Sequence, residues 1–191
     1  MRQDTRVLCI FSPPHSDVFK ATLLARGGAL GFFMPQPHEE IHVRTTEQYL
    51  GDIKVSLGSY VAERLKLNTT TSGVSQDFNN ATWFAHNMVW KWGMGGSGLI
   101  GNYNLLENMR EDYGSFRGEK SSFLSEKLKE QLNTDVQKIL NDCLKEVQDL
   151  LIRESSLLDR FAQELLNKDE LNYDEIEAIF KDFGKARPFI R

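Results

Sequence analysis

Asp77 is the residue in this 191-residue chain whose position most suggests chemistry. It lies near the start of residues 71–94, which open with Thr, Ser and Gly and continue with helical apolar spacing. The positions four, seven and eleven after Asp77 are apolar, so its carboxylate should leave the helix at the edge of the buried face. Such a carboxylate either stabilises the positive end of the helix dipole or serves as a ligand or acid–base group. The residues alone favour the first role.

Residues 38–42 read His-Glu-Glu-Ile-His and match the HExxH pattern of zinc proteases. In that pattern a helix presents both His on one face, and the Glu acts as general base on the metal-bound water. Here two prolines precede the match, little apolar stripe accompanies it, and a clear helix start follows at Thr45. We therefore interpret the match as accidental, in a loop or short turn. A zinc site made by His38, His42 and Asp77 is a weaker hypothesis that stays open.

Other polar and small residues give no catalytic pattern. Residues 94–98 are glycine-rich, but they follow a helix rather than a strand and lack the Lys of a P-loop. We interpret them as a helix C-cap followed by a flexible turn. Glu63, near the end of a predicted helix, is expected to be a solvated charge. Cys9 and Cys143 lack ligand spacing and indicate free thiols in a reducing compartment.

Composition excludes several classes of function. The net charge is −4, and no basic stripe interleaved with aromatics is present, which argues against nucleic-acid binding. No apolar run approaches the roughly 18 residues that a membrane span requires. The apolar and charged fractions, 40% and 26%, are ordinary for a globular protein with one sizeable core.

The periodicity predicts a mainly α chain with a small β-hairpin or meander near the N-terminus and a C-terminal helical bundle. Ser75 is the expected N-cap of the helix that carries Asp77, and Gly93 its stop. Thr45 and Asn172 begin expected capping boxes. A break is expected near residues 133–134. The expected helices cover residues 45–65, 75–93, 122–151, 155–166 and 173–183.

Residues 17–34 have the pattern of the predicted hairpin. Val18–Leu24 and Ala29–Met34 are the two apolar runs, with a Gly-Gly turn between them and Pro35 as the end of the second run. A flat edge strand of this kind could bind an extended peptide through its main chain. The alternative is an ordinary hairpin that covers one side of the helical core, and the residues alone favour it.

Taken together, four stretches resemble the C-terminal peptidase domain of FtsH-type proteases, which are membrane-anchored, ATP-dependent zinc metalloproteases. DVFKATLLARGGALGFFMP resembles the family's HKVTIIPRGxALGxT, and LGSYVAERL resembles LGGRAAEEI. TSGVSQDFNNATWFAHNMVWKWGM resembles TTGASNDLERATxxARxMVxxWGM and is the most specific of the four. LLDRFAQELLNKDELNYDEIEAIF resembles the terminal bundle segment. The resemblance covers about residues 7–183.

The resemblance implies roles for a few residues. Asp77 matches the aspartate that is the third zinc ligand in the family, and Glu63 matches a glutamate near the metal whose role stays open. The substrate peptide is expected to align along an edge formed by Ala29, Leu30, Gly31 and Phe32.

The departure from the family concerns its zinc-binding motif. The family's HExxH directly precedes the segment that matches Val7–Phe11, and here Met1–Thr5 falls in that place without His or Glu. Residues 38–42 match a polar connection of the family instead. Asp77 alone gives one ligand where catalytic zinc needs three from protein, so we expect this chain neither to bind zinc tightly nor to cleave peptides. Two explanations stay open: loss of the motif by truncation, or a non-catalytic protease-like domain that acts as a scaffold or ring component.

The resemblance also implies partners and organisation. We expect unfolded protein substrates, a homo-oligomeric, hexameric ring in the full-length protein, and ATP only through an ATPase domain that this sequence lacks. The expected location is cytoplasmic, at the inner face of a membrane. We expect a single domain over residues 1–191, with the metal-site half and hairpin in 1–120, the bundle in 121–184 and a tail in 185–191.

Overall fold

The computed structural model describes residues 16–22, 32–37, 43–107 and 124–185. Within these ranges the chain is mainly α with a small sheet, which confirms the predicted fold class. The strands are β1 (Ser16–Thr22), β2 (Phe32–Pro37) and β3 (Glu170–Asn172). The helices are α1 (Thr46–Leu67), the 3-10 helix η2 (Ser72–Val74), α2 (Ser75–Trp90), α4 (Glu126–Arg153), α5 (Ser155–Lys168) and α6 (Tyr173–Asp182).

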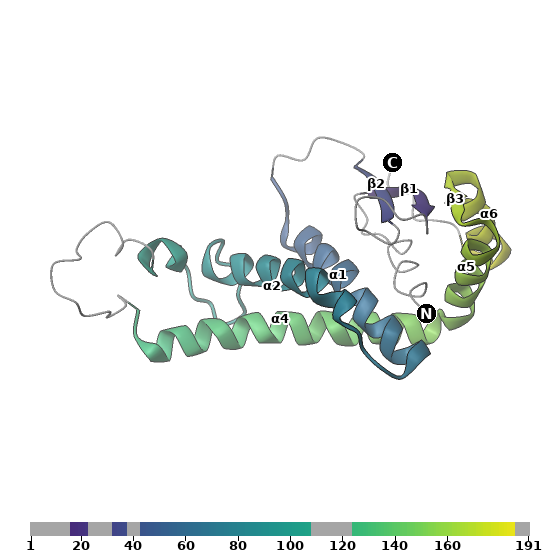
Figure 1. Cartoon of the computed structure of the whole chain (residues 1–191). Coiled ribbons are helices and arrows are strands. Elements are labelled where there is room, and N and C mark those ends of the chain that lie inside the picture. Colours follow the sequence, from purple (N-terminus) through teal and green to yellow (C-terminus); the bar gives the residue numbers. More distant parts are fainter. Residues whose placement is uncertain (1–15, 23–31, 38–42, 108–123, 186–191) are drawn as a thin grey trace.

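The long helix α4 supports the other helices. It runs along one side of the molecule, α1 and α2 pack on it, and α5, α6 and the sheet gather near its C-terminal end (Figure 1). One buried cluster lies among α1, α2 and α4 and includes Ile53, Met88 and Leu132, each 0% exposed. A second cluster surrounds Phe161, whose ring lies 5.3 Å from that of Phe180. No helix in the described ranges is long and apolar enough to cross a membrane.

Both predicted capping boxes are confirmed. At the start of α1, the Thr45 backbone N–H donates to the Gln48 side chain at 2.9 Å, and Gln48 N–H donates back to Thr45 Oγ1 at 3.4 Å. At the start of α6, Asn172 and Glu175 exchange the equivalent bonds at 3.0 Å each. Each box satisfies backbone donors that the first turn leaves free.

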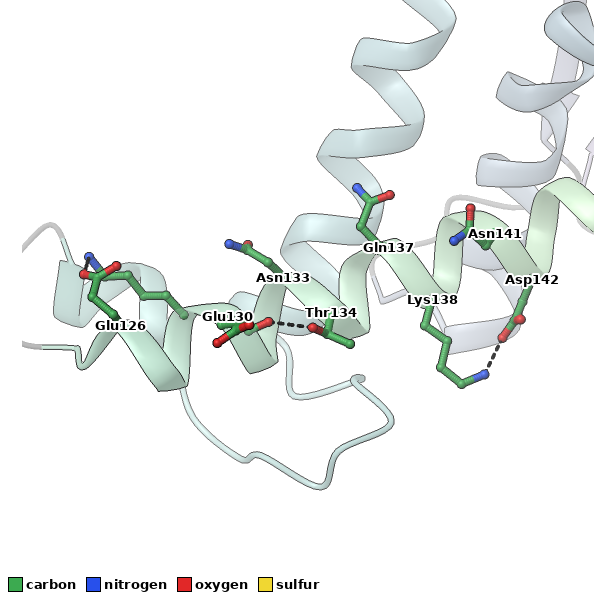
Figure 2. A pocket seen from close by; sticks show the side chains of 9 residues that line it. Glu126, Glu130, Asn133, Thr134, Gln137, Lys138, Asn141 and Asp142 are labelled. Carbon is green, nitrogen blue, oxygen red and sulfur yellow. Dashed lines mark hydrogen bonds and ion pairs between the residues drawn. The ribbon is translucent and has the colours of Figure 1, made fainter.

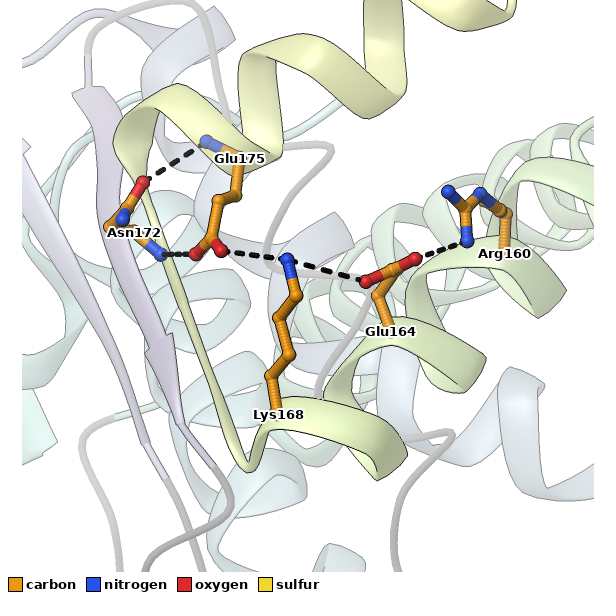
Figure 3. A network of polar contacts seen from close by, with 5 residues as sticks. All are labelled: Arg160, Glu164, Lys168, Asn172 and Glu175. Carbon is orange, nitrogen blue, oxygen red and sulfur yellow. Dashed lines mark hydrogen bonds and ion pairs between the residues drawn. The ribbon is translucent and has the colours of Figure 1, made fainter.

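The box of α6 continues into a polar network with α5 (Figure 3). Lys168 Nζ lies 2.8 Å from Glu175 Oε1 and 3.6 Å from Glu164 Oε2, and Glu164 also pairs with Arg160. Because its members are partly exposed, this network of ion pairs between α5 and α6 adds little free energy of folding.

The prediction that Ser75 is the N-cap of α2 is wrong. Ser75 is already the first residue of α2, and Val74 at the N-cap position makes no side-chain cap bond. The cap lies earlier, where Thr71 Oγ1 accepts from Gly73 N–H at 3.2 Å at the start of η2. The 3-10 turn leads directly into α2, so the cluster of small polar residues caps the turn rather than the helix.

The prediction that Gly93 stops α2 is confirmed, although the last helical residue is Trp90. The helix ends at Trp90, and Gly93 has φ +67°, a left-handed conformation that glycine adopts without a Cβ penalty. Beyond it, Met94 N–H reaches back to Met88 O at 2.7 Å and satisfies a terminal carbonyl.

The glycine-rich turn that follows is fixed in place by an acidic side chain of α4. Ser97 donates to Asp135 Oδ2 through its N–H at 3.0 Å and its hydroxyl at 2.5 Å. Asp135 is only 7% exposed. The turn is therefore held in place by two hydrogen bonds to a buried side chain, and the expectation of a flexible turn is wrong. A Cβ built on Gly95 would lie 2.6 Å from Asp135 Oδ2, which explains the absence of a side chain there.

The break expected near residues 133–134 is absent, because α4 is continuous from Glu126 to Arg153. A Thr hydroxyl within a helix can compete for backbone groups. In the structure Thr134 Oγ1 donates to the Glu130 carbonyl at 2.8 Å and is satisfied inside the helix.

The sheet has the order β2-β1-β3, with β1 antiparallel to both neighbours. The pairing of β1 with β2 agrees with the predicted hairpin, but β2 continues past the expected end at Pro35 to Pro37. Proline is tolerated there because β2 is an edge strand of the described sheet. The sequence did not reveal β3, whose Leu171 pairs with Ala21 from far along the chain.

Cys143 on α4 is a buried free thiol, 2% exposed, and burial raises its pKa to about 11. Because thiolate is the reactive form, about one thiol in a thousand would be reactive at pH 8 even without steric protection. Cys9 lies outside the described residues.

We predict that, in a Cys9→Ser background, Cys143 reacts with a disulfide reagent at least about 100-fold more slowly in the native chain than in urea. Absorbance of the released thiolate at pH 8 measures both rates. The Cys9→Ser/Cys143→Ala chain serves as the blank. Fast native labelling would contradict the burial of this thiol.

Candidate functional site

Asp77 lies in the first turn of α2 and points at α1. Its Oδ2 accepts a hydrogen bond from Ser59 Oγ at 2.5 Å, and Ser59 is 3% exposed. Oδ1 receives no hydrogen bond from any residue that the structure describes. The carboxylate is half-buried, and one of its oxygens is anchored to α1. The expected inward aim of Asp77 is confirmed by this contact with α1.

The surroundings of Asp77 disfavour its charge. Burial raises the pKa of the Asp77 carboxyl above its ordinary value, the Ser59 hydroxyl lowers it in part, and the nearby Glu63 charge raises it again. A carboxylate placed this way gains from a cation, which would replace the lost hydration.

Glu63 is a buried structural acceptor, and its expected role as a solvated charge is wrong. It is 6% exposed, its Oε2 accepts from Thr71 N–H at 2.7 Å, and its Oε1 accepts from Thr71 Oγ1 at 2.9 Å. Both oxygens are thus engaged with the residue that caps η2. Glu63 fixes the turn from which α2, and with it Asp77, begins.

Sequence reasoning missed Ser59, which lies one helical turn before Glu63 on α1. Residues four apart lie on the same helix face, so a Ser and a Glu at this spacing can meet one neighbouring segment. The available signal was this pair of polar residues on the otherwise apolar buried side of α1.

The described residues do not complete a metal centre. No group of three His, Cys, Asp or Glu side chains suited to a metal occurs among residues 16–22, 32–37, 43–107 and 124–185. The HEEIH stretch 38–42, Ala29, Leu30 and Gly31, and the segment Val7–Phe11 lie outside the described residues, whereas Phe32 begins β2. Asp77 could supply one ligand to zinc, but the described part of the chain does not supply the set of three that a catalytic zinc needs.

A second polar region is a shallow groove along the outer face of α4 (Figure 2). The side chains that line the groove all come from α4. Two of their contacts lie within that helix: Lys138 pairs with Asp142 at 2.7 Å, and Thr134 Oγ1 donates to the Glu130 carbonyl. A single solvated helix face offers no convergent groups for catalysis. Asp77 therefore remains the candidate site.

We predict that Thr71→Val lowers the free energy of unfolding by about 1–3 kcal/mol, because Glu63 loses a donor while it stays buried. Thr70→Val is the matched control, since Thr70 is exposed and one residue away. Urea unfolding followed by circular dichroism compares the two variants. Equal midpoints for both would contradict the anchoring role of Glu63.

We predict that Asp77→Asn in EDTA at pH 7 has an unfolding midpoint equal to or above that of the wild type. The amide keeps an acceptor for Ser59 and removes a charge that its half-buried setting disfavours. Thermal unfolding measures the difference. A clearly lower midpoint would mean that the Asp77 charge stabilises the metal-free fold.

Known proteins resemble this chain over most of its length. The model of Peptidase family M41 matches residues 6–179. The chain is 32% identical over 166 residues to the ATP-dependent zinc metalloprotease FtsH of Borreliella burgdorferi (strain ZS7), covering 86% of this chain and 26% of that protein. It is 32% identical over 183 residues to the FtsH of Thermobaculum terrenum, covering 95% and 28%. The chain spans about a quarter of the length of these curated relatives. By the match over most of its length, the chain belongs to peptidase family M41.

Proposed function

We propose that this chain is the peptidase region of an ATP-dependent zinc metalloprotease that hydrolyses peptide bonds of protein substrates in protein quality control. The observation that carries the proposal is Asp77, a half-buried carboxylate of α2 whose Oδ2 is anchored by Ser59 of α1. Membership in family M41 supports it, as do relatives that are named zinc metalloproteases.

In this proposal Asp77 is one of three protein ligands of a catalytic zinc. When bound, the zinc would polarise the scissile carbonyl and lower the pKa of its water. The contribution of this chain is to hold Asp77 on a rigid element: Glu63 fixes the preceding turn through Thr71, and Ser59 fixes one carboxylate oxygen.

We further propose that the chain by itself neither binds zinc tightly nor cleaves peptides, because one carboxylate is too few ligands. The alternative function is a catalytically inactive, protease-like scaffold or ring-assembly domain. A self-contained zinc site made by His38, His42 and Asp77 is a third, weaker hypothesis.

For substrate binding we propose Ala29, Leu30, Gly31 and Phe32, of which Phe32 is the first residue of β2. Support comes from the strand order, because β2 pairs with β1 on one side and is an edge of the described sheet. An extended peptide can add to such an edge through main-chain hydrogen bonds, which suits substrates of varied sequence.

The organisation follows from the same proposal. We propose one domain over residues 1–191, with a metal-site half in 1–120, a bundle in 121–184 and a tail in 185–191. Its partners would be unfolded protein substrates and copies of itself in a hexameric ring, with ATP used by an ATPase domain of the full-length protein. The location would be cytoplasmic, at the inner face of a membrane, and no nucleic acid would bind.

We predict that the purified chain contains far less than one zinc per molecule by mass spectrometry of metals and does not cleave unfolded casein. His42→Ala and Asp77→Asn are the matched variants. Stoichiometric zinc that both variants lose would contradict the proposal and support the site made by His38, His42 and Asp77. Casein cleavage without zinc would contradict the metal mechanism itself.

The coding sequence upstream of Met1 discriminates the two proposed functions. An in-frame HExxH there, preceded by an ATPase domain, supports the protease. A true start codon with neither supports the scaffold.

A further inference from the structure

The outer face of α2 is exposed and carries no formal charge. Asp77 is the only Asp, Glu, Lys or Arg of this helix, and it points at α1 instead. Gln76, Asn79 and Asn80 are exposed, and Trp83 is 56% exposed. Charged residues make up 26% of the whole chain, so a surface helix face without any is unusual here. The cores of protein interfaces are likewise depleted of charge and enriched in Trp.

The exposed residues of α2 have the spacing of a helix–helix contact. Gln76, Asn80 and Trp83 follow one another at intervals of four and three residues, which is one heptad of a seam that faces another helix. The opposite side of α2 already packs on α1 and α4, where Ala81 and Ala85 are 1% and 0% exposed. The helix therefore has a second face with the pattern of a packing surface, and this face is exposed.

The exposed indole of Trp83 is held in place by its neighbours. Its ring lies edge-on to those of Phe84, at 5.2 Å, and Trp92, at 6.3 Å. At the edge of the same face, His86 stacks on Trp90 at 5.0 Å, and burial lowers its pKa, so it is uncharged at pH 7. A large ring that is already ordered loses little side-chain entropy when it is covered, which is typical of an anchor residue in an interface.

The chemistry of this face fits a second copy of itself. Asn and Gln side chains each contain a donor and an acceptor, so like amides can pair with one another. Gln76 Nε2 donates to Asn80 Oδ1 at 3.1 Å, and the pair still offers the Asn80 amide protons and the Gln76 carbonyl oxygen. A charged face would repel its own copy, whereas this uncharged face meets no such cost.

We propose that two copies of this chain associate weakly by packing the outer faces of α2 against each other, antiparallel and about a twofold axis. The exposed stretch runs from Gln76 to Trp83, so its midpoint lies between Asn79 and Asn80. These amides would face their counterparts, and Trp83 of each copy would cover Gln76 of the other. Antiparallel packing also sets the two helix dipoles against each other favourably.

This contact goes beyond the proposed peptidase function and does not depend on it. A twofold contact uses the same patch on both copies and joins only two chains, whereas a ring is closed by head-to-tail contacts between different patches. The two kinds of assembly are therefore distinguishable by their stoichiometry.

The size of α2 limits the strength of the contact. Its 16 residues span about 24 Å, and the exposed stretch is shorter. Stable interfaces bury roughly 800 Å² on each partner, which is more than one short helix face offers. We therefore expect a dissociation constant between about 0.1 and 1 mM.

The first test is sedimentation equilibrium of the 191-residue chain from about 10 to 500 µM. We expect the average mass to rise above the 21.9 kDa of one copy and to fit a monomer–dimer equilibrium. Trp83→Lys should weaken association at least about tenfold. Ile152→Lys is the matched control, because Ile152 lies on α4 and is equally exposed at 56%, and it should associate like the wild type.

The outcomes of this test are distinct. A mass of one copy at all concentrations, or an equal loss of association in both variants, would overturn the proposal. Hexamers that Trp83→Lys leaves intact would support the ring and overturn the twofold contact through α2.

The second test leaves Trp83 in place and so does not depend on the folding of that variant. In a Cys9→Ser/Cys143→Ala background, Asn80→Cys lies next to the proposed axis and should oxidise to a disulfide-linked dimer. Asn141→Cys is the matched control, because Asn141 is an exposed Asn on α4. We expect Asn80→Cys to cross-link at least about tenfold faster, measured by non-reducing gel electrophoresis over time. Equal rates for the two variants would overturn the contact.

Discussion

The structure around the site depends on one constraint: the buried carboxylate of Glu63 and the half-buried carboxylate of Asp77 must both find donors. An unpaired buried charge costs several kcal/mol, so the connection between α1 and α2 is not free to take any path. It passes where Thr71 can give Glu63 both its N–H and its hydroxyl. That path sets the 3-10 turn, the start of α2 and the direction of Asp77. Glu63 thus influences the position of Asp77 indirectly, through the two hydrogen bonds that it accepts from Thr71.

The far end of α2 is held by a similar arrangement. Gly93 reverses the chain, and the turn that follows is bound to Asp135 of α4 through Ser97. The ring of Trp92 stacks on Tyr49 of α1 at 4.5 Å, which ties the same end to the neighbouring helix. With contacts at both ends, α2 is held in a fixed orientation against α1 and α4, and Asp77 near its start is held with it.

The parts that local sequence determines were predictable, and the parts that distant partners determine were not. The boxes at Thr45 and Asn172 need only residues three apart, so the pattern was sufficient. The spacing of Ser59 and Glu63 on α1 was a local signal, but the donor that satisfies Glu63, Thr71, lies across a loop and could not be read from that spacing. The same holds for β3, which exists through pairing with β1 from the other end of the chain. Of the site, the inward direction of Asp77 followed from periodicity, whereas Ser59 required the fold.

The position of Asp77 also shows why stability alone does not explain it. Its surroundings raise the pKa of the carboxyl, so the charged form weakens the metal-free fold, and a single hydroxyl offsets this only in part. A neutral side chain would serve packing at least as well. A residue that is charged against the preference of its surroundings is typical of a functional site, where stability is given up for chemistry. Among the contacts of Asp77, the Ser59 hydroxyl favours the charged form of the carboxyl, and the nearby Glu63 charge opposes it.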